Sequence, residues 1–214
     1  MGVPRRAAAL ALLMLAAGGS GRCTEPPAPG ATQPAPAAAA SAAIGQSGVT
    51  VQGRVQAVGT AVVVLEPKTP QSFAPQSEKP VMDQVGLTFG PELLLVRTGQ
   101  PVEFRNNDDT LHNVNVKHEE TRGQAFNVAI PTGGTFEYTF TRDGFYRVAC
   151  DIHPAMAASI YSSSTPYAAV ADGDGRFTFA DVPPGPWTIT VFTGGRRLQK
   201  DVELKGGTVD VAVE

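Results

Sequence analysis

Short apolar runs separated by turn residues recur along most of the chain. Some of them alternate between apolar and polar residues, as in 102–104 and 136–140, and this period of two is typical of β-strands. We predict strands at residues 49–51, 61–65, 93–96, 102–104, 136–140, 145–149, 157–161, 176–179, 187–192 and 209–213. Almost no segment has a helical period, so the pattern predicts an all-β fold built from sandwiches.

The size of the patterned region and its turns refine this prediction. The chain of 214 residues contains 23 Gly and 18 Pro, and pairs such as Asp143-Gly144 fall between the predicted strands. The strand pattern covers roughly 165 residues, more than one small sandwich of about 100 residues needs. We therefore expect two sandwiches.

The N-terminal segment is typical of an export signal. Arg5 and Arg6 precede an unbroken apolar run of eleven residues, 7–17, and small residues follow at 18–21. Eleven apolar residues are too few to span a bilayer. We predict a signal peptide over 1–22, removed on export to the periplasm or cell envelope, and no transmembrane helix in the mature protein. The Arg5-Arg6 pair leaves both the general secretory and the twin-arginine route open.

Residues 23–47 predict a disordered tether, since they are rich in Pro and Ala and have almost no large apolar side chains. Cys23 stands where a bacterial lipoprotein carries its lipid, although Arg22 before it departs from the usual small residue. Lipidation, which would make a membrane anchor, and an unmodified cysteine both remain open. Removing 1–22 leaves 14 Lys and Arg against 20 Asp and Glu. Such an acidic chain is not expected to bind nucleic acid.

Candidate chemistry is concentrated in one loop and in one segment upstream of it. Residues 150–156 bring Cys150, His153 and Met156 together after a predicted strand, and His112 follows another strand upstream. Two imidazoles, one thiolate and a weak thioether form the ligand set of a blue-copper electron-transfer site. With only 2 Cys and 3 His in the chain, a disulfide-stapled scaffold and a four-thiolate metal site are excluded.

These motifs resemble the cupredoxins, the family of plastocyanin and pseudoazurin, over residues 80–163. The resemblance implies a Greek-key sandwich that binds one copper ion, with His112 and His153 as nitrogen ligands, Cys150 as the thiolate and Met156 as the axial ligand. It also implies that Asn113 supports the first ligand. Only two residues separate His153 from Met156, fewer than in plastocyanin-like loops, and this departure leaves the axial bond open.

Two further candidates are set aside. His118 lies in the charged run 117–120, which predicts a solvated surface and no ligand role. Residues 172–176 begin like a calcium-binding loop, but Arg176 stands where a third acidic ligand is needed, so a turn is predicted.

A second resemblance lies outside the cupredoxin segment. Residues 172–191 are similar to part of the transthyretin-like, carboxypeptidase-regulatory-like sandwich, and 53–55 with 61–65 are similar to its opening strands. We therefore expect that 48–70 and 164–214 form one discontinuous domain into which the cupredoxin is inserted. The alternative makes 48–70 an extra pair of cupredoxin strands and 164–214 a C-terminal appendage.

Together these features predict an exported one-electron carrier that works between transient redox protein partners. It is not expected to be an enzyme, because four protein ligands leave no open position for a substrate. Copper trafficking or storage is one alternative. A surface interaction module with a structural metal is another.

Overall fold

The computed structural model describes residues 48–57 and 59–213, and every regular element among them is a β-strand. The prediction of an all-β fold is confirmed. None of these residues forms a helix that is long and apolar enough to cross a membrane. The predicted signal peptide 1–22, the tether 23–47 and Cys23 lie outside the described residues.

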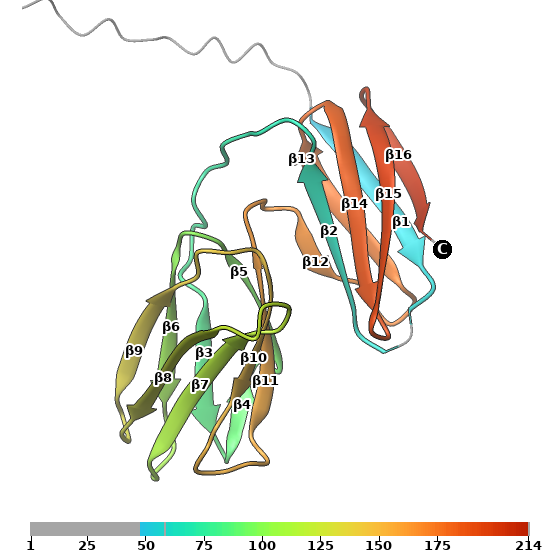
Figure 1. Cartoon of the computed structure of the whole chain (residues 1–214). Helices are drawn as coiled ribbons and strands as arrows, with labels where there is room; N and C mark the ends of the chain where they lie inside the picture. Colours follow the sequence, from blue (N-terminus) through green and yellow to red (C-terminus); the bar gives the residue numbers. More distant parts are fainter. Residues whose placement is uncertain (1–47, 58, 214) are drawn as a thin grey trace, which may run out of the picture. The chain divides into compact units, whose positions relative to one another are not determined.

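The strands form four sheets (Figure 1). Their bounds are β1 (Val49–Val55), β2 (Ala61–Pro67), β3 (Val81–Val85), β4 (Thr88–Gly90), β5 (Leu93–Arg97), β6 (Pro101–Asn106), β7 (His112–His118), β8 (Gln124–Ile130), β9 (Thr135–Thr139), β10 (Gly144–Ala149), β11 (Ala157–Ser163), β12 (Ala168–Val170), β13 (Arg176–Val182), β14 (Gly185–Thr193), β15 (Arg196–Leu204) and β16 (Thr208–Val213).

Strands β3 to β11 form the sandwich that carries the candidate metal ligands. One sheet has the order β5-β11-β10-β7-β8 and the other β4-β3-β6-β9. Side chains at alternate positions of the strands fill the space between the two sheets. In β6, for example, Val102, Phe104 and Asn106 are buried, and the residues that alternate with them are exposed or half-exposed. The core contains Met82, Phe104, Val114, Val116, Phe140, Val148, Cys150, Met156 and Ile160, among others. Two of the four candidate ligands therefore belong to this core.

The remaining strands form two further sheets with their own core. In one, β1 pairs with β13 and β16, and in the other, β2 pairs with β12 and β14 (Figure 1). Both strands from residues 49–67 are thus central strands flanked by strands from 168–213. Trp187, the one Trp of the chain, is fully buried in this core, and its indole N–H donates to the Pro183 carbonyl at 3.0 Å.

Strand β2 is buried on both faces. Val63 and Leu65 enter the core around Trp187, whereas Val62 and Val64 pack in a separate apolar cluster with Tyr161 of β11. Residues between two apolar layers need no polar alternation. This explains the continuous apolar run 61–65.

Burial also raises the pKa of the Tyr161 hydroxyl, so this side chain stays un-ionised at ordinary pH.

Candidate metal centre

The first candidate ligand, His112, begins β7 and is completely buried. Its Nε2 atom lies 2.8 Å from the Oδ2 atom of Asp108. A carboxylate only accepts hydrogen bonds, so in the neutral imidazole Nε2 carries the hydrogen and Nδ1 keeps a free lone pair. The Nδ1 atom faces Cys150 and His153. The structure therefore presents His112 with its Nδ1 atom toward the other candidate ligands.

The other three candidates lie on the loop between β10 and β11. The Met156 amide donates to the His153 carbonyl at 2.9 Å, and the Cys150 amide donates to the Met156 carbonyl at 3.3 Å. The His153 amide points at the Cys150 Sγ atom, 3.4 Å away. The loop is thus closed on itself, with the sulfur held near its centre.

Three donor atoms meet at this end of the sandwich. The His112 and His153 Nδ1 atoms are 3.0 Å apart, and the Cys150 Sγ atom is 3.9 Å from the first and 3.8 Å from the second. For comparison, zinc lies about 2.0–2.1 Å from imidazole nitrogen and about 2.3 Å from thiolate sulfur. Donors of one ion are therefore at most about 4.2–4.4 Å apart, and all three separations meet this limit. Two nitrogens and one soft sulfur suit copper.

Among the described residues, these three are the group of His, Cys, Asp and Glu side chains placed to hold a metal ion. Met156 is 1% exposed and packs in the same core as Cys150. The loop therefore brings the thioether residue to the right region of the fold. Its role as an axial ligand stays a prediction.

Asn113 ties the ligand loop to the sheet, whereas its expected support of the first ligand, His112, stays a prediction. Its Oδ1 atom accepts hydrogen bonds from the Asp151 amide at 2.7 Å and the Ile152 amide at 3.3 Å. It also lies 3.4 Å from the Cys150 Sγ atom. Its Nδ2 atom donates to Asn127 at 2.8 Å and to the Asp151 carboxylate at 3.1 Å. One side chain thus holds the backbone between two candidate ligands.

The structure adds polar contacts that the sequence analysis missed. The Asp151 carboxylate accepts hydrogen bonds from Asn115 at 2.9 and 3.0 Å and from Asn127 at 2.9 Å. These bonds, with Asn115 first and Asn127 second, lower the pKa of Asp151. The residues lie on the paired strands β7 and β8, with Asn115 opposite Asn127. The polar alternation of 113, 115 and 127 along two strands was the available signal.

Asp108 was missed as well. Besides its contact with His112, its carboxylate accepts the Gly86 amide at 2.6 Å and the Leu87 amide at 2.9 Å. The Leu87 bond first, and the His112 bond next, lower the pKa of Asp108. Its position four residues before His112 was visible in the sequence, but the contact depends on the path of the loop between β6 and β7.

The prediction that His118 is a solvated residue is wrong. The side chain is buried, its ring packs edge-on against Tyr146, and Nε2 lies 3.2 Å from the Asp143 carbonyl. Nδ1 accepts from the Thr121 amide at 3.2 Å. His118 is the last residue of β7, and its imidazole points inward. Its charged neighbours at 117, 119 and 120 face solvent. It secures the β7–β8 connection and lies outside the group of metal donors.

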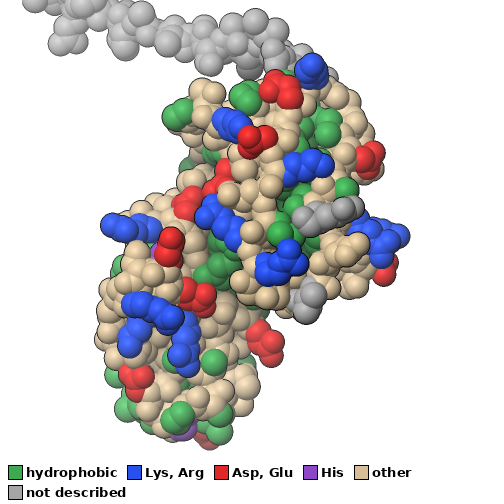
Figure 2. Space-filling view, turned by 45° about the vertical axis from the view of Figure 1, so that its right-hand side comes forward, with side chains coloured by type: hydrophobic (Ala, Val, Ile, Leu, Met, Phe, Trp, Pro, Cys, Tyr) green, Lys and Arg blue, Asp and Glu red, His purple; other side chains and the backbone are tan. Residues whose placement is uncertain are grey.

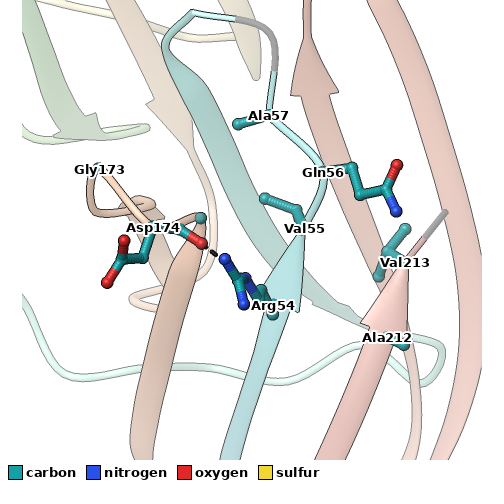
Figure 3. A pocket seen from close by; sticks show the side chains of 9 residues that line it. Arg54, Val55, Gln56, Ala57, Gly173, Asp174, Ala212 and Val213 are labelled. Atoms are coloured by element: carbon teal, nitrogen blue, oxygen red, sulfur yellow. Dashed lines mark hydrogen bonds between the residues drawn. The ribbon is translucent and has the colours of Figure 1, made fainter.

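The calcium-like segment 172–176 forms a turn, as predicted. The Asp172 carboxylate accepts the amides of Asp174 at 2.9 Å and Arg176 at 2.7 Å, so its oxygen serves the turn itself. A hollow of about 520 Å³ adjoins this turn, and there Arg54 donates to the Asp174 backbone oxygen at 2.8 Å (Figure 3). The described residues that line it include no His or Cys. This hollow therefore offers no soft metal ligand.

The sequence of the metal-binding segment matches a known family. Residues 77–161 match the family described as copper binding proteins, plastocyanin/azurin family. The match includes His112, Cys150, His153 and Met156 and covers less than half of the chain. No curated protein matches the chain. The copper-binding family and the donor triangle together identify copper as the metal of this site.

Solved structures similar to part of the chain include a purple cupredoxin from Nitrosopumilus maritimus, with 24% identity over 40% of this chain and 100% of that one and a TM-score of 0.36. A copper-containing nitrite reductase from Thermus scotoductus SA-01 has 25% identity over 47% of this chain and 26% of its own, with a TM-score of 0.38. A reduced amicyanin variant has 20% identity over 47% and 99%, with a TM-score of 0.37.

Proposed function

We propose that this protein is an exported, mononuclear type 1 copper protein that carries one electron at a time between redox proteins. The observation that carries the proposal is the triangle of His112 Nδ1, His153 Nδ1 and Cys150 Sγ, whose edges measure 3.0, 3.8 and 3.9 Å. Bound copper would supply a one-electron couple between Cu(I) and Cu(II). The fixed donors lower the rearrangement that accompanies each electron transfer.

The surroundings of the site suit electron transfer to a protein partner. His112 and Cys150 are buried, whereas His153 is only partly covered, so its imidazole is the ligand nearest to solvent. Leu111 and Ile152, which precede the two histidines, are 48% and 47% exposed. In Figure 2 a histidine surface lies beside apolar side chains at the lower end of the view. A small apolar surface of this kind favours brief, weak encounters with partners.

We assign no catalytic reaction to this site. The proposed ligands are four side chains of the chain itself, His112, Cys150, His153 and Met156, which would occupy the positions that a substrate needs. Electron carriage instead requires that the ligands stay in place while the charge of the ion changes. The loop hydrogen bonds and Asn113 supply that constraint.

The test is a copper titration of the full chain, followed by visible absorption. We expect an intense thiolate-to-copper band that disappears on reduction and is missing in Cys150→Ser. The matched control is Cys23→Ser, which removes the other cysteine of the chain and should keep the band. If copper binds without such a band, or if Cys150→Ser keeps it, the ligand assignment is wrong.

Copper trafficking is the competing function, and the reduced protein distinguishes the two. We expect slow loss of Cu(I) to a strong chelator, together with fast electron self-exchange, because two of the three measured donors are buried. Fast loss of Cu(I) would instead favour metal hand-over. A copper ion that cannot be reduced without unfolding the protein would favour a structural metal in an interaction module.

We further propose that 48–70 and 164–214 form one transthyretin-like domain that accepts the cupredoxin, 80–163, as an insertion. The pairing of β1 with β13 and β16, and of β2 with β12 and β14, supports this proposal. Limited proteolysis should cut near the two junctions and leave 48–70 associated with 164–214. Release of 164–214 without 48–70 would contradict it.

Export is also part of the proposal. The positive pair Arg5-Arg6 and the apolar run 7–17 support a cleaved signal, and Cys23 followed by a Pro/Ala-rich stretch supports a lipid anchor in the cell envelope. Mass spectrometry of the mature N-terminus tests both. An unprocessed N-terminus would refute export, and an unmodified Cys23 would refute the anchor.

A further inference from the structure

The turn between β3 and β4 has an unusual composition for its conformation. Gly86 and Leu87 both adopt positive φ, 62° and 57°. Glycine accepts this left-handed conformation freely, but a residue with a Cβ atom is disfavoured there. Leu87 is in addition 52% exposed. Two unfavourable features at one residue mean that other contacts must hold the turn.

Those contacts come from one carboxylate. The Oδ1 atom of Asp108 accepts the Gly86 amide at 2.6 Å, and Oδ2 accepts the Leu87 amide at 2.9 Å. The same Oδ2 atom accepts the hydrogen of His112 Nε2 at 2.8 Å. A single side chain therefore joins an exposed turn to a buried candidate ligand.

Asp108 is itself fixed from the side of the core. Its amide donates to the Asn106 Oδ1 atom at 3.0 Å. The Asn106 side chain is completely buried, and its Nδ2 atom donates to the carbonyls of Thr110 at 2.9 Å and Ile130 at 2.7 Å. The loop that carries Asp108 thus has a defined path. The carboxylate is held between this loop and the turn amides.

We propose that Asp108, held by the Gly86-Leu87 turn, is a positioning residue that sets the tautomer and ring orientation of His112. The proposal rests on the copper site of the proposed function. By accepting the Nε2 hydrogen, the carboxylate keeps Nδ1 unprotonated and directed at the other donors, 3.0 Å from His153 and 3.9 Å from Cys150. Acceptors of this kind orient metal-binding imidazoles and raise their basicity.

A purely structural role would make a different prediction. If Asp108 served only to hold the turn, its two amide bonds would suffice, and His112 could take either tautomer. Loss of the carboxylate would then loosen the turn and leave the His112 ring unaffected. The tautomer of His112 in the metal-free protein therefore separates the two roles.

The first experiment measures the ring nitrogens of His112 by ¹⁵N NMR in the metal-free full chain at about pH 8, where a free imidazole is neutral. We expect a protonated Nε2 and an unprotonated Nδ1 in the parent chain. In Asp108→Asn we expect this single tautomer to be lost. The matched control is Asp109→Asn, one residue away, where the exposed carboxylate has no hydrogen bond within the described residues. It should leave the tautomer unchanged.

The second experiment measures copper affinity by competition with a chelator. We expect Asp108→Asn to bind copper about 10- to 100-fold more weakly, the usual cost of losing such a support, and Asp109→Asn to match the parent chain.

Three results would overturn the proposal: a His112 protonated at Nδ1 in the parent chain, the parent tautomer in Asp108→Asn, or equal affinity loss in Asp108→Asn and Asp109→Asn. Failure of the proposed function gives a separate result. In that case copper fails to bind or shows no thiolate band, while the tautomer measurement on the metal-free protein still decides the role of Asp108.

Discussion

Replacing Asn113 by Ala should destabilise the metal-free protein more than replacing Asn115 or Asn127, the other two asparagines that bond to the Asp151 carboxylate. Asn113 is 7% exposed and makes three short hydrogen bonds, to the Asp151 amide at 2.7 Å, to Asn127 at 2.8 Å and to the Asp151 carboxylate at 3.1 Å. Each is worth about 0.5–1.5 kcal/mol net. Water can replace part of the bonds to the exposed partners, so we expect a loss of about 2–3 kcal/mol.

Asn115→Ala is the matched control. Asn115 also donates to the Asp151 carboxylate, at 2.9 and 3.0 Å, but that contact is exposed. Its removal leaves Asp151 bound by Asn113 and Asn127, so we expect a loss of about 1 kcal/mol or less. Urea unfolding with linear extrapolation resolves this difference.

Copper adds a second measurement to the same pair of variants. Asn113 holds the amides of Asp151 and Ile152, which lie between Cys150 and His153 in the loop. Its loss should therefore weaken copper binding, and the stabilisation that copper gives to folding should shrink accordingly. Asn115→Ala should keep most of that stabilisation. Equal losses in the two variants, with or without copper, would refute the reasoning.

Three further outcomes are expected. Gly144 has φ 122°, and a Cβ atom there would lie 2.9 Å from His118 Nε2, whereas Gly133 has φ 71° and open space around it. Gly144→Ala should therefore lower the unfolding free energy by about 1–3 kcal/mol, more than Gly133→Ala. Equal urea midpoints for the two variants would contradict this. Hydrogen bonds lower the pKa of Asp151, so its contribution to folding stability is present at neutral pH and lost in acid as the carboxylate protonates. The difference in urea midpoint between the parent and Asp151→Asn should therefore narrow from pH 7 toward pH 3. A difference that stays constant with pH would refute the assignment. Trp187→Ala should cost about 3–5 kcal/mol in thermal or urea unfolding followed by circular dichroism, since the ring is completely buried; a loss below 1 kcal/mol would contradict the packing.

Alternation and turn residues located ten of the sixteen strands of the described chain, but they missed β3, β4, β7, β8, β12 and β15. The predicted strand 136–140 corresponds to β9 (Thr135–Thr139), and 187–192 lies within β14 (Gly185–Thr193). Strand β15 (Arg196–Leu204) was missed, because most of its residues are exposed and charged. It is an edge strand that exists through its pairing with β14 across the Gly194-Gly195 turn. Such a strand has almost no signal of its own in the sequence.

The candidate ligands were visible in the sequence, whereas the residues that hold them in place were not. Cys150, His153 and His112 stand out in the sequence because few residue types bind soft metals. Asp108 and Asp151 do not, because Asp is common in turns and its role depends on which amides the fold brings to it. The error at His118 has a related cause: its neighbours 117, 119 and 120 are charged, yet the strand turns the imidazole inward. Composition of a window cannot give the direction of one side chain.

The two carboxylates beside the candidate ligands, Asp108 and Asp151, have different partners from other carboxylates of the described chain. Elsewhere in the described chain, carboxylates such as Glu103 and Asp201 form ion pairs with Lys or Arg side chains. Asp108 and Asp151 instead bind uncharged amides and the His112 ring, and Lys117 acts on Asp151 through space more weakly than those amides. Their lowered pKa values keep both ionised at neutral pH. Both carboxylates therefore carry negative charge beside the candidate ligands, and amide groups rather than ion pairs hold them in place.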